Sequence, residues 1–289
     1  MRHCLGGDRR REHEVAILKY PGAKNRLAGW ICEYIPEHDV YVEPYAGSLA
    51  VLFNKRPCHI ETVNDINDEV VNYFRVLRDN GQELQEMISL TPYARSEYDA
   101  AYKNSDDDIE RARRFCVRCW MGFGCSNLYK NGFKSGQQTK SPNPARAWAG
   151  LPEIMKAAKE RLKNVQIECL PALELISRYD TEDVFMYLDP PYLHGTRKNY
   201  LYKYEMSDRD HEELLRVLVK HPGKILLSGY ENEMYNDYLS SWSKVQKDTN
   251  AENGLARTET LWMNYDTKIR QISLFDQELS REKGRIWRD

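Results

Sequence analysis

The sequence contains no apolar run long enough to span a membrane, and its first residues lack the apolar segment of a signal peptide. Residues 1–14 are instead dense in charge, and we expect them to form a flexible tail. Internal repeats and low-complexity segments are also absent. With 41% hydrophobic and 30% charged residues, the 289-residue chain has the composition of a globular protein rather than a disordered one.

Cysteine is too scattered to indicate a disulfide framework. The chain has seven cysteines, a usage typical of a reducing compartment, so we expect a cytoplasmic protein. Cys116, Cys119 and Cys125 lie close together in the sequence, but no fourth ligand follows at a spacing suited to zinc. We therefore expect no metal site.

Acidic residues are missing from one long stretch. The net charge of the whole chain is −2, so binding of nucleic acid would need a local basic patch. Residues 111–152 contain no Asp or Glu, although the chain has 44 acidic residues. Glycines between residues 122 and 136 predict a hairpin or an extended loop within this stretch. Its basic residues are Arg111, Arg113, Arg114, Arg118, Lys130, Lys134, Lys140 and Arg146.

These residue types suit a DNA-binding surface. Lysine side chains neutralise phosphates, while Asn, Gln and Arg side chains read the edges of bases. We therefore predict phosphate contacts for Lys130, Lys134 and Lys140, and base contacts for Asn127 or Arg118. The alternative is a solvated basic surface that only balances the acidic remainder of the chain.

A buried strand that ends abruptly is the clearest pattern in the sequence. Residues 184–188 are five apolar residues, and the two prolines that follow Asp189 cannot continue a sheet ladder. Asp189 is therefore expected at the carboxyl end of a strand, where open α/β sheets bind their ligands. The Asp189 carboxylate, the Pro190 carbonyl and the Tyr192 ring could together hold a planar group that carries an NH2. The alternative is a strand followed by a proline turn, with Asp189 as an exposed cap.

An earlier segment has the strand–turn–helix order of a nucleotide-binding α/β unit. Residues 40–43 form an apolar strand that ends at Pro44. Gly47 in the following turn permits a positive φ or a close approach of the backbone to a ligand. We expect Ser48 to cap a helix over residues 49–54.

A second strand and a lysine turn complete the predicted crevice. Residues 59–63 lead to Asp65, roughly 20 residues after the glycine turn, where such folds bind ribose hydroxyls. Asp65 or Asn67 could instead cap the next helix. The turn at Pro21-Gly22 leads into a helical pattern and predicts an anion site that Lys24 would strengthen.

Together these segments resemble the Dam-like, D12 class adenine-N6 DNA methyltransferases. Asp189-Pro190-Pro191-Tyr192 resembles the catalytic tetrapeptide of that family. Residues 19–24 resemble its first motif, and residues 43–48 resemble its cofactor loop, except that Leu49 stands where glycine is usual. Residues 257–265 resemble a late motif near the pocket for the flipped base, although their alternation fits a plain edge strand equally well.

The resemblance implies a set of functional residues. It implies S-adenosylmethionine as the methyl donor and double-stranded DNA as the substrate. The catalytic residues would be Asp189, Pro190, Pro191 and Tyr192. The cofactor contacts would be Tyr20, Lys24, Glu43, Pro44, Tyr45, Ala46, Gly47, Ser48, Asp65 and Asp189.

The resemblance also implies the architecture. We expect an α/β protein with a Rossmann-like methyltransferase fold, in which a mostly parallel, doubly wound sheet carries an inserted DNA-recognition subdomain. The catalytic domain would comprise residues 15–80 and 160–270, the inserted target-recognition region residues 81–159, and a charged tail residues 271–289. We expect a monomer or weak dimer in a bacterial or phage-infected cell. GATC is the first DNA sequence to test, and whether a restriction enzyme accompanies the protein is an open question.

Three other functions compete with this interpretation. A nucleotide-dependent oxidoreductase would require a fuller Gly-x-Gly-x-x-Gly pattern, which the sequence lacks. A DNA-binding module without enzyme activity would account for the basic stretch but leave the segment at Asp189 without a role. A methyltransferase that acts on RNA or protein remains open, although such enzymes more often have Asn in place of Asp189.

Overall fold

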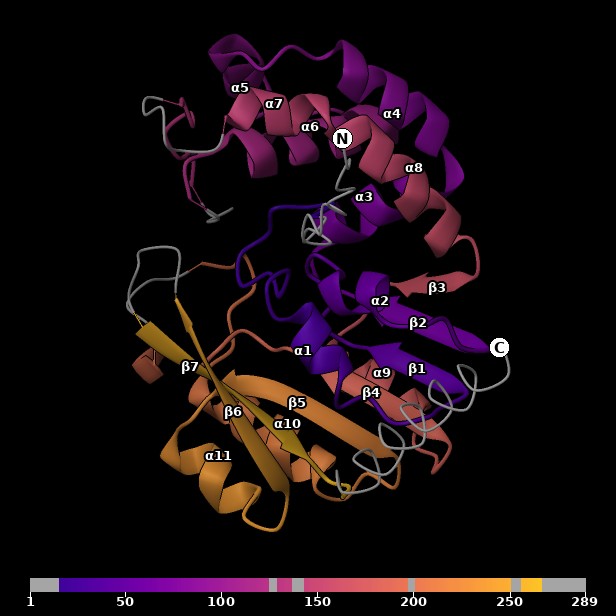
Figure 1. The fold of residues 1–289 in the computed structure, drawn as a ribbon, viewed down its shortest axis with the longest axis vertical. Helices are drawn as coiled ribbons and strands as arrows, with labels where there is room; N and C mark the ends of the chain where they lie inside the picture. The colour runs from indigo at the N-terminus through magenta and orange to yellow at the C-terminus, as the bar shows by residue number, and fades with distance from the viewer. Residues whose placement is uncertain (1–15, 125–128, 137–142, 197–200, 251–255, 267–289) are drawn as a thin grey trace, which may run out of the picture.

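A seven-stranded sheet forms the centre of the protein (Figure 1). The structure is a computed structural model, and it describes residues 16–124, 129–136, 143–196, 201–250 and 256–266. The strand order is β3-β2-β1-β4-β5-β7-β6. The first five strands in this order pair in parallel, whereas β7 is antiparallel to both β5 and β6. The strands are β1 (Val40–Glu43), β2 (Ile60–Asn64), β3 (Val165–Glu168), β4 (Val184–Leu188), β5 (Lys224–Tyr230), β6 (Ser243–Asn250) and β7 (Ala256–Met263).

The order of the parallel strands reverses between β1 and β4. From β1 the chain continues outward to β2 and β3 on one side, while β4 and β5 lie on the other side. Val42 pairs with Met186, so the two strands end at the same edge of the sheet. In open α/β sheets the ligand binds outside the carboxyl ends of the strands at such a reversal.

β4 is buried along its whole length because structure covers both faces of the sheet. Successive side chains of a strand point to opposite faces. Phe185 and Tyr187 accordingly belong to one hydrophobic cluster, and Met186 and Leu188 to the other. This double burial explains why the strand appears in the sequence as a continuous apolar run.

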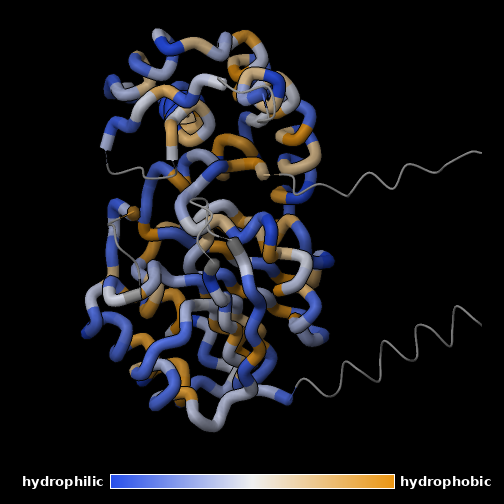
Figure 2. The backbone as a smooth tube through the Cα atoms, turned by 60° about the vertical axis from the view of Figure 1, so that its left-hand side comes forward, coloured by the Kyte–Doolittle hydropathy of each residue, from blue (hydrophilic) through white to orange (hydrophobic). Residues whose placement is uncertain are grey.

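Helices flank the sheet and also form a separate group beyond α3. In Figure 1, α3 lies between the sheet and helices α4 to α8, and it packs against α4, α6 and α8. Figure 2 shows hydrophobic residues both in the sheet region and in this helical group. The helices are α1 (Ala28–Cys32), α2 (Ala50–Asn54), α3 (Asp68–Asp79), α4 (Gly81–Leu90), α5 (Arg95–Ala100), α6 (Asp108–Met121), α7 (Pro144–Ala149), α8 (Leu151–Leu162), α9 (Ala172–Arg178), α10 (Asp208–Leu218) and α11 (Glu233–Tyr238), with a 3-10 turn at His194–Thr196.

The helical group is held by buried aromatic contacts of its own. The Trp120 and Trp148 rings meet edge to face with centroids 6.5 Å apart. The indole N–H of Trp148 donates to the Thr91 carbonyl at 2.8 Å, so its one polar atom is satisfied in the interior. Within the described residues, no helix is long and apolar enough to cross a membrane.

The predicted glycine-rich hairpin is present where the structure describes it. The Phe123 N–H donates to the Gly132 carbonyl at 2.6 Å, and the Lys134 N–H donates to the Met121 carbonyl at 2.7 Å. These bonds pair the two arms in antiparallel fashion, while residues 125–128 lie outside the described part of the chain. The hairpin directly follows the carboxyl end of α6.

The prediction that Ser48 caps α2 is wrong. The N-cap is Leu49, which makes no side-chain cap bond. Gly47 has φ of 47° and Leu49 has φ of 56°, so the turn passes through the left-handed region twice before the helix begins. The helix therefore starts one residue later than the sequence predicted.

Candidate active site

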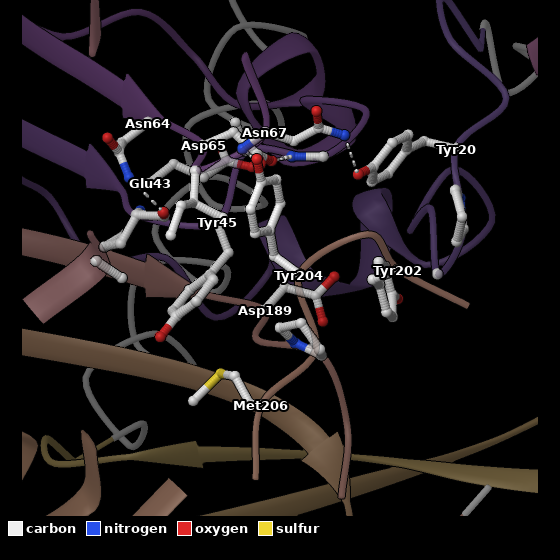
Figure 3. Close-up of a pocket in the computed structure, with 18 of the residues that line it drawn as sticks. Tyr20, Glu43, Tyr45, Asn64, Asp65, Asn67, Asp189, Tyr202, Tyr204 and Met206 are labelled. Carbon is white, nitrogen blue, oxygen red and sulfur yellow. Dashed lines mark hydrogen bonds between the residues drawn. The ribbon is translucent and has the colours of Figure 1, made fainter. Parts of the chain in front are cut away.

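A cavity of about 540 Å³ lies at the carboxyl ends of β1, β2 and β4, at the reversal of the strand order (Figure 3). Glu43 ends β1, Asp65 follows β2, and Asp189 follows β4, so each of these three strands contributes a carboxyl group to the wall. Every residue predicted to contact the cofactor lines this cavity. The sequence motifs, although distant in the chain, therefore meet at one site.

Asn67 takes the capping role that the sequence left open between Asp65 and Asn67. The Asn67 side chain accepts a hydrogen bond from the Glu69 N–H at 3.2 Å and so caps α3. Asp65 lines the cavity and accepts hydrogen bonds at 2.9 Å from the backbone N–H groups of Gly47 and Asn67. Burial nevertheless raises the pKa of Asp65 to about 6, because it outweighs the stabilising effect of the two N–H groups.

Tyr20 joins the first motif to this wall. Its hydroxyl accepts a hydrogen bond from the Asn67 side-chain amide at 3.3 Å. Gly47 faces the Tyr20 ring, and a Cβ at position 47 would make an ordinary van der Waals contact with the ring at 3.4 Å. Glycine suits this position because its φ is 47°, in the left-handed region where other residues are strained.

Glu43 is a buried acid near Asp189. Its side chain is almost fully buried and accepts a hydrogen bond from the Tyr41 hydroxyl at 2.7 Å. Burial raises the pKa of Glu43 to about 8, against the opposing effect of Tyr41, and the Asp189 carboxylate adds to the rise. Burial therefore favours the protonated form of Glu43 relative to an ordinary glutamate.

Asp189 is held in place from behind by the neighbouring strand. Ser228 on β5 donates its hydroxyl to Asp189 Oδ1 at 2.9 Å. The Tyr187 hydroxyl lies 3.2 Å from Ser228 Oγ, so a buried chain of two hydroxyls leads to the carboxylate. Pro191 lines the cavity beside Asp189, and Pro190 is buried. These contacts fix the direction of the carboxylate.

Lys24 contacts this carboxylate rather than an exposed anion. Its ammonium lies 2.8 Å from Asp189 Oδ1 and 3.6 Å from Glu259 Oε1, and it donates to the Gly22 carbonyl at 3.0 Å. Burial by itself would lower the pKa of Lys24, but the Asp189 and Glu259 carboxylates outweigh it and raise the pKa. The turn at Pro21-Gly22 therefore does not form the anion site that the sequence predicted, because two carboxylates already neutralise its lysine.

Tyr192 completes the cluster together with residues that the sequence analysis did not single out. The Tyr192 hydroxyl donates to Glu259 on β7. The rings of Tyr192 and Tyr230 pack edge to face with centroids 4.6 Å apart, and the Lys24 ammonium lies 4.7 Å from the centroid of the Tyr192 ring. Glu259 lies inside the segment that resembled the family's late motif, which was the signal that could have identified it.

The loop after the tetrapeptide covers the cavity. Tyr202, Tyr204 and Met206 line it (Figure 3). A Cβ at Gly22 would lie 2.2 Å from the Tyr202 hydroxyl, so the loop packs directly on the turn that carries Lys24. A larger residue at position 22 would require the Tyr202 side chain to shift, and it would also be strained because φ is 69°.

Several residues of the acid-free stretch already have acidic partners in space. Arg118 pairs with Glu69 and donates to the Ala101 carbonyl at 2.7 Å. Lys130 pairs with Asp99 at 2.6 Å on the surface. Lys134 is half-buried at the base of the hairpin, and Asn127 and Lys140 lie outside the described residues. The structure therefore places three of the five predicted DNA contacts, and it engages the Arg118 and Lys130 side chains in ion pairs.

Large exposed aromatic side chains mark the same hairpin. Phe123 and Tyr129 are each 71% exposed, far more than the other aromatic residues of the helical group.

Within the described residues, no group of three or more His, Cys, Asp or Glu side chains could hold a metal ion.

Comparisons with known proteins agree on one family. Residues 20–253 match the family model described as D12 class N6 adenine-specific DNA methyltransferase. A type II methyltransferase from Methanocaldococcus jannaschii is 27% identical over 264 residues, which cover 80% of this chain and 89% of the relative. Another type II methyltransferase, from Lactococcus lactis subsp. cremoris, is 25% identical over 70% of this chain and 74% of its own length.

A shorter match has a more specific name. A DNA N-6-adenine-methyltransferase of Escherichia phage P1 is 28% identical over 114 residues. This match covers 36% of the present chain and 15% of the phage protein.

Proposed function

Because this chain belongs to the D12 class of N6 adenine-specific DNA methyltransferases, we propose that its cavity binds S-adenosylmethionine and that Asp189 receives the target adenine at the cavity edge. Membership of the family confirms the predicted activity, which is methyl transfer to the N6 amino group of adenine in DNA. It also confirms the predicted Rossmann-like methyltransferase fold.

The chemistry of the cavity fits this methyl donor. Acidic side chains outnumber lysines in its wall by six to two, and by five to two without the buried Glu43, which suits a ligand that carries a sulfonium and an ammonium group. Asp65 offers a carboxylate for the two ribose hydroxyls, and Tyr20 and Tyr45 offer aromatic surface. The bound donor would supply an activated methyl group. The acidic residues of the wall are Glu43, Asp65, Asp189, Glu205, Asp210 and Glu213.

The role of Asp189 follows from the weakness of the nucleophile. The lone pair of adenine N6 is delocalised into the ring, so the amine needs both orientation and electron density. The Asp189 carboxylate accepts one N–H and the Pro190 carbonyl accepts the other, which directs the lone pair toward the methyl group. The base must leave the duplex to reach this position, at a cost of roughly a few kcal/mol. The Tyr192 ring offers the surface on which it stacks.

One observation carries the proposal. Asp189 stands beside the cavity at the reversal of the strand order, and Ser228 holds its carboxylate in a fixed direction. A surface cap would not need a buried hydroxyl partner from the next strand. The arrangement therefore favours a catalytic carboxylate over the alternative of an exposed strand cap.

We also propose that the helical group within residues 81–159 binds the target DNA. Its hairpin presents Phe123 and Tyr129 to solvent, with Lys130 and Lys134 nearby in the sequence. Basic and aromatic side chains together suit phosphate contact and base stacking. Arg118 would have to leave Glu69 before it could contact a base, so we assign it a structural contribution in addition.

The activity is tested by incubating the protein with labelled S-adenosylmethionine and separate DNA, RNA and protein substrates. Duplexes with and without GATC are compared, and the methylated nucleoside is identified after digestion. We expect N6-methyladenine from DNA alone. Label in cytosine, RNA or protein, or no label in any substrate, would contradict the proposal.

The catalytic assignment is tested with Asp189→Ala and the exposed control Asp183→Ala. Asp189→Ala should lower the rate of transfer by roughly 10²-fold or more, because positioned groups contribute at least that much. The control should keep the wild-type rate. If Asp189→Ala retains more than roughly a tenth of the wild-type rate with an unchanged melting temperature, Asp189 does not have this role.

A further inference from the structure

The Lys24 ammonium is enclosed by groups from three different segments of the chain. Asp189 and Tyr192 belong to the catalytic tetrapeptide, whereas the Gly22 carbonyl and Glu259 belong to the first turn and to β7. A protonated lysine has three N–H donors, and the two carboxylates and the carbonyl supply three acceptors. The side chain is only 7% exposed, so this arrangement is part of the interior.

Lys24 touches two of the three residues that the proposed function assigns to the target base, Asp189 and Tyr192. It lies 2.8 Å from the carboxylate that would accept the adenine N–H, and 4.7 Å from the centroid of the ring on which the base would stack. A cation on an aromatic face and a stacked purine use the same surface. The ammonium and the base therefore compete for one place.

From this geometry we propose that the Lys24 ammonium holds the position of the target amino group, and that Glu259 receives the ammonium when the base enters. This inference rests on the proposed function. Glu259 already lies 3.6 Å from the ammonium, so Lys24 can leave Asp189 without leaving the cluster. Asp189 keeps the hydroxyl of Ser228 as a partner throughout.

The charge of the buried cluster gives the physical reason for a second carboxylate. Lys24 contributes one positive charge against the carboxylates of Asp189 and Glu259. If the ammonium moved to solvent, the two carboxylates would face each other in a poorly hydrated site, which is costly. If the Lys24 ammonium moves only as far as Glu259, it stays within the cluster and the net charge of the cluster is unchanged. The neutral amine of the base then takes the place beside Asp189 that the ammonium has left. Glu259 is thus a positioning residue that acts through Lys24.

The inference is tested by measuring how readily the base enters the pocket in single and double variants. The probe is a duplex with 2-aminopurine directly beside the adenine that the wild-type enzyme methylates. The target adenine keeps its N6 amino group, and the fluorescence of its neighbour rises when the adenine leaves the stack. The variants are Glu259→Gln, Lys24→Met and their combination. Glutamine can still accept the Tyr192 hydroxyl, and the double variant keeps the net charge of the wild-type cluster. The exposed residue Glu231 provides the control, Glu231→Gln.

We expect Glu259→Gln to lower the equilibrium constant for base entry roughly tenfold, the effect of losing one charge-assisted hydrogen bond, because Lys24 then has Asp189 as its sole carboxylate partner. Adding Lys24→Met should return base entry toward the wild-type value, since no ammonium remains to be displaced. Rescue by a second substitution in the same cluster would not occur if Glu259 only supported the fold or the Tyr192 hydroxyl.

Two results separate failure of this inference from failure of the proposed function. If the wild-type protein does not methylate adenine in DNA, the proposed function fails. If it does, and the double variant admits the base no better than Glu259→Gln alone, only the competition between Lys24 and the base is refuted. Because base entry is measured without the methyl donor, any loss of donor binding by Lys24→Met does not affect the result.

Discussion

Replacing Leu49 by glycine and, separately, by alanine tests the backbone of the cofactor loop. Leu49 has φ of 56° at the start of α2, in the left-handed region where glycine is at ease and other residues are strained. It is also the position at which the segment of residues 43–49 departs from the cofactor-loop pattern that it resembles, which has glycine there. The leucine side chain is fully buried in the hydrophobic core.

The two substitutions remove the same packing but differ in backbone strain. Loss of a buried leucine side chain costs roughly 2–5 kcal/mol in either variant. Alanine keeps the left-handed strain of roughly 1–2 kcal/mol, which glycine relieves. Glycine in turn loses roughly 0.5–1 kcal/mol more conformational entropy on folding than alanine does. We therefore expect both variants to be less stable than the wild type, and Leu49→Gly to be at least as stable as Leu49→Ala.

The assay is thermal or urea unfolding of both variants under one set of conditions. Ala50→Gly provides the control, because it removes a methyl group from the next residue, which lies in the right-handed helix. That change should destabilise the protein in the ordinary way, by roughly 0.5–1 kcal/mol. If Leu49→Gly is less stable than Leu49→Ala by a similar amount, residue 49 is not left-handed in solution and the loop geometry described above is incorrect.

Three further predictions concern the donor, the pH and the DNA. Asp65→Ala should raise the dissociation constant for S-adenosylmethionine, measured by calorimetry, without changing DNA affinity. If the melting temperature falls while the dissociation constant is unchanged, Asp65 has only a structural role. Burial raises the pKa of Glu43 from 4.5 to about 8, so the folded state keeps a proton that the unfolded chain releases. The free energy of unfolding should therefore fall between pH 5.5 and 8, with a contribution from Glu43 of up to roughly 1.4 kcal/mol per pH unit, and Glu43→Gln should flatten this decline; equal slopes would contradict the raised pKa. Lys134→Gln should weaken binding of all DNA sequences and reduce the slope of log affinity against log salt by roughly one. Arg118→Gln should mainly lower the melting temperature, because Arg118 already pairs with Glu69. If neither variant changes DNA affinity or the salt slope, the basic stretch is a solvated surface.

The position of Asp189 could be predicted because the information is local. A run of five apolar residues and two prolines define both the strand and its end, and the structure has β4 at Val184–Leu188. The same holds for the glycine turn and for Asp65, which follow single strands. In each case a short segment determines which residue stands at the carboxyl edge of the sheet.

Glu259 could not be placed in the same way. Its strand joins the sheet by antiparallel pairing with β5, which sets Glu259 opposite Tyr230. Nothing in the alternation of residues 257–265 specifies this partner, because a plain edge strand has the same pattern. Contacts between distant segments, such as that of Lys24 with Asp189, were beyond local reasoning for the same reason.

The acid-free stretch shows a different limit. Composition correctly identified an excess of basic residues, but it gave no information about their neighbours in space. Arg111 pairs with Asp68 on α3, and Arg113 pairs with Glu97 on α5. A segment without acids in the sequence is therefore not a segment without acids around it, and part of its charge stabilises the packing of the helical group.

The contact of Lys24 with Glu259 joins segments from near opposite ends of the sequence, and this has a consequence for the order in which the site matures during synthesis. The described residues that line the proposed donor cavity end at Leu214, so the lining can be synthesised before the last strands are translated. The proposed pocket for the base includes Glu259 on β7, which is the last strand of the described chain. A nascent chain would thus acquire its donor site before its base site, and methylation would begin only after β7 has entered the sheet between β5 and β6.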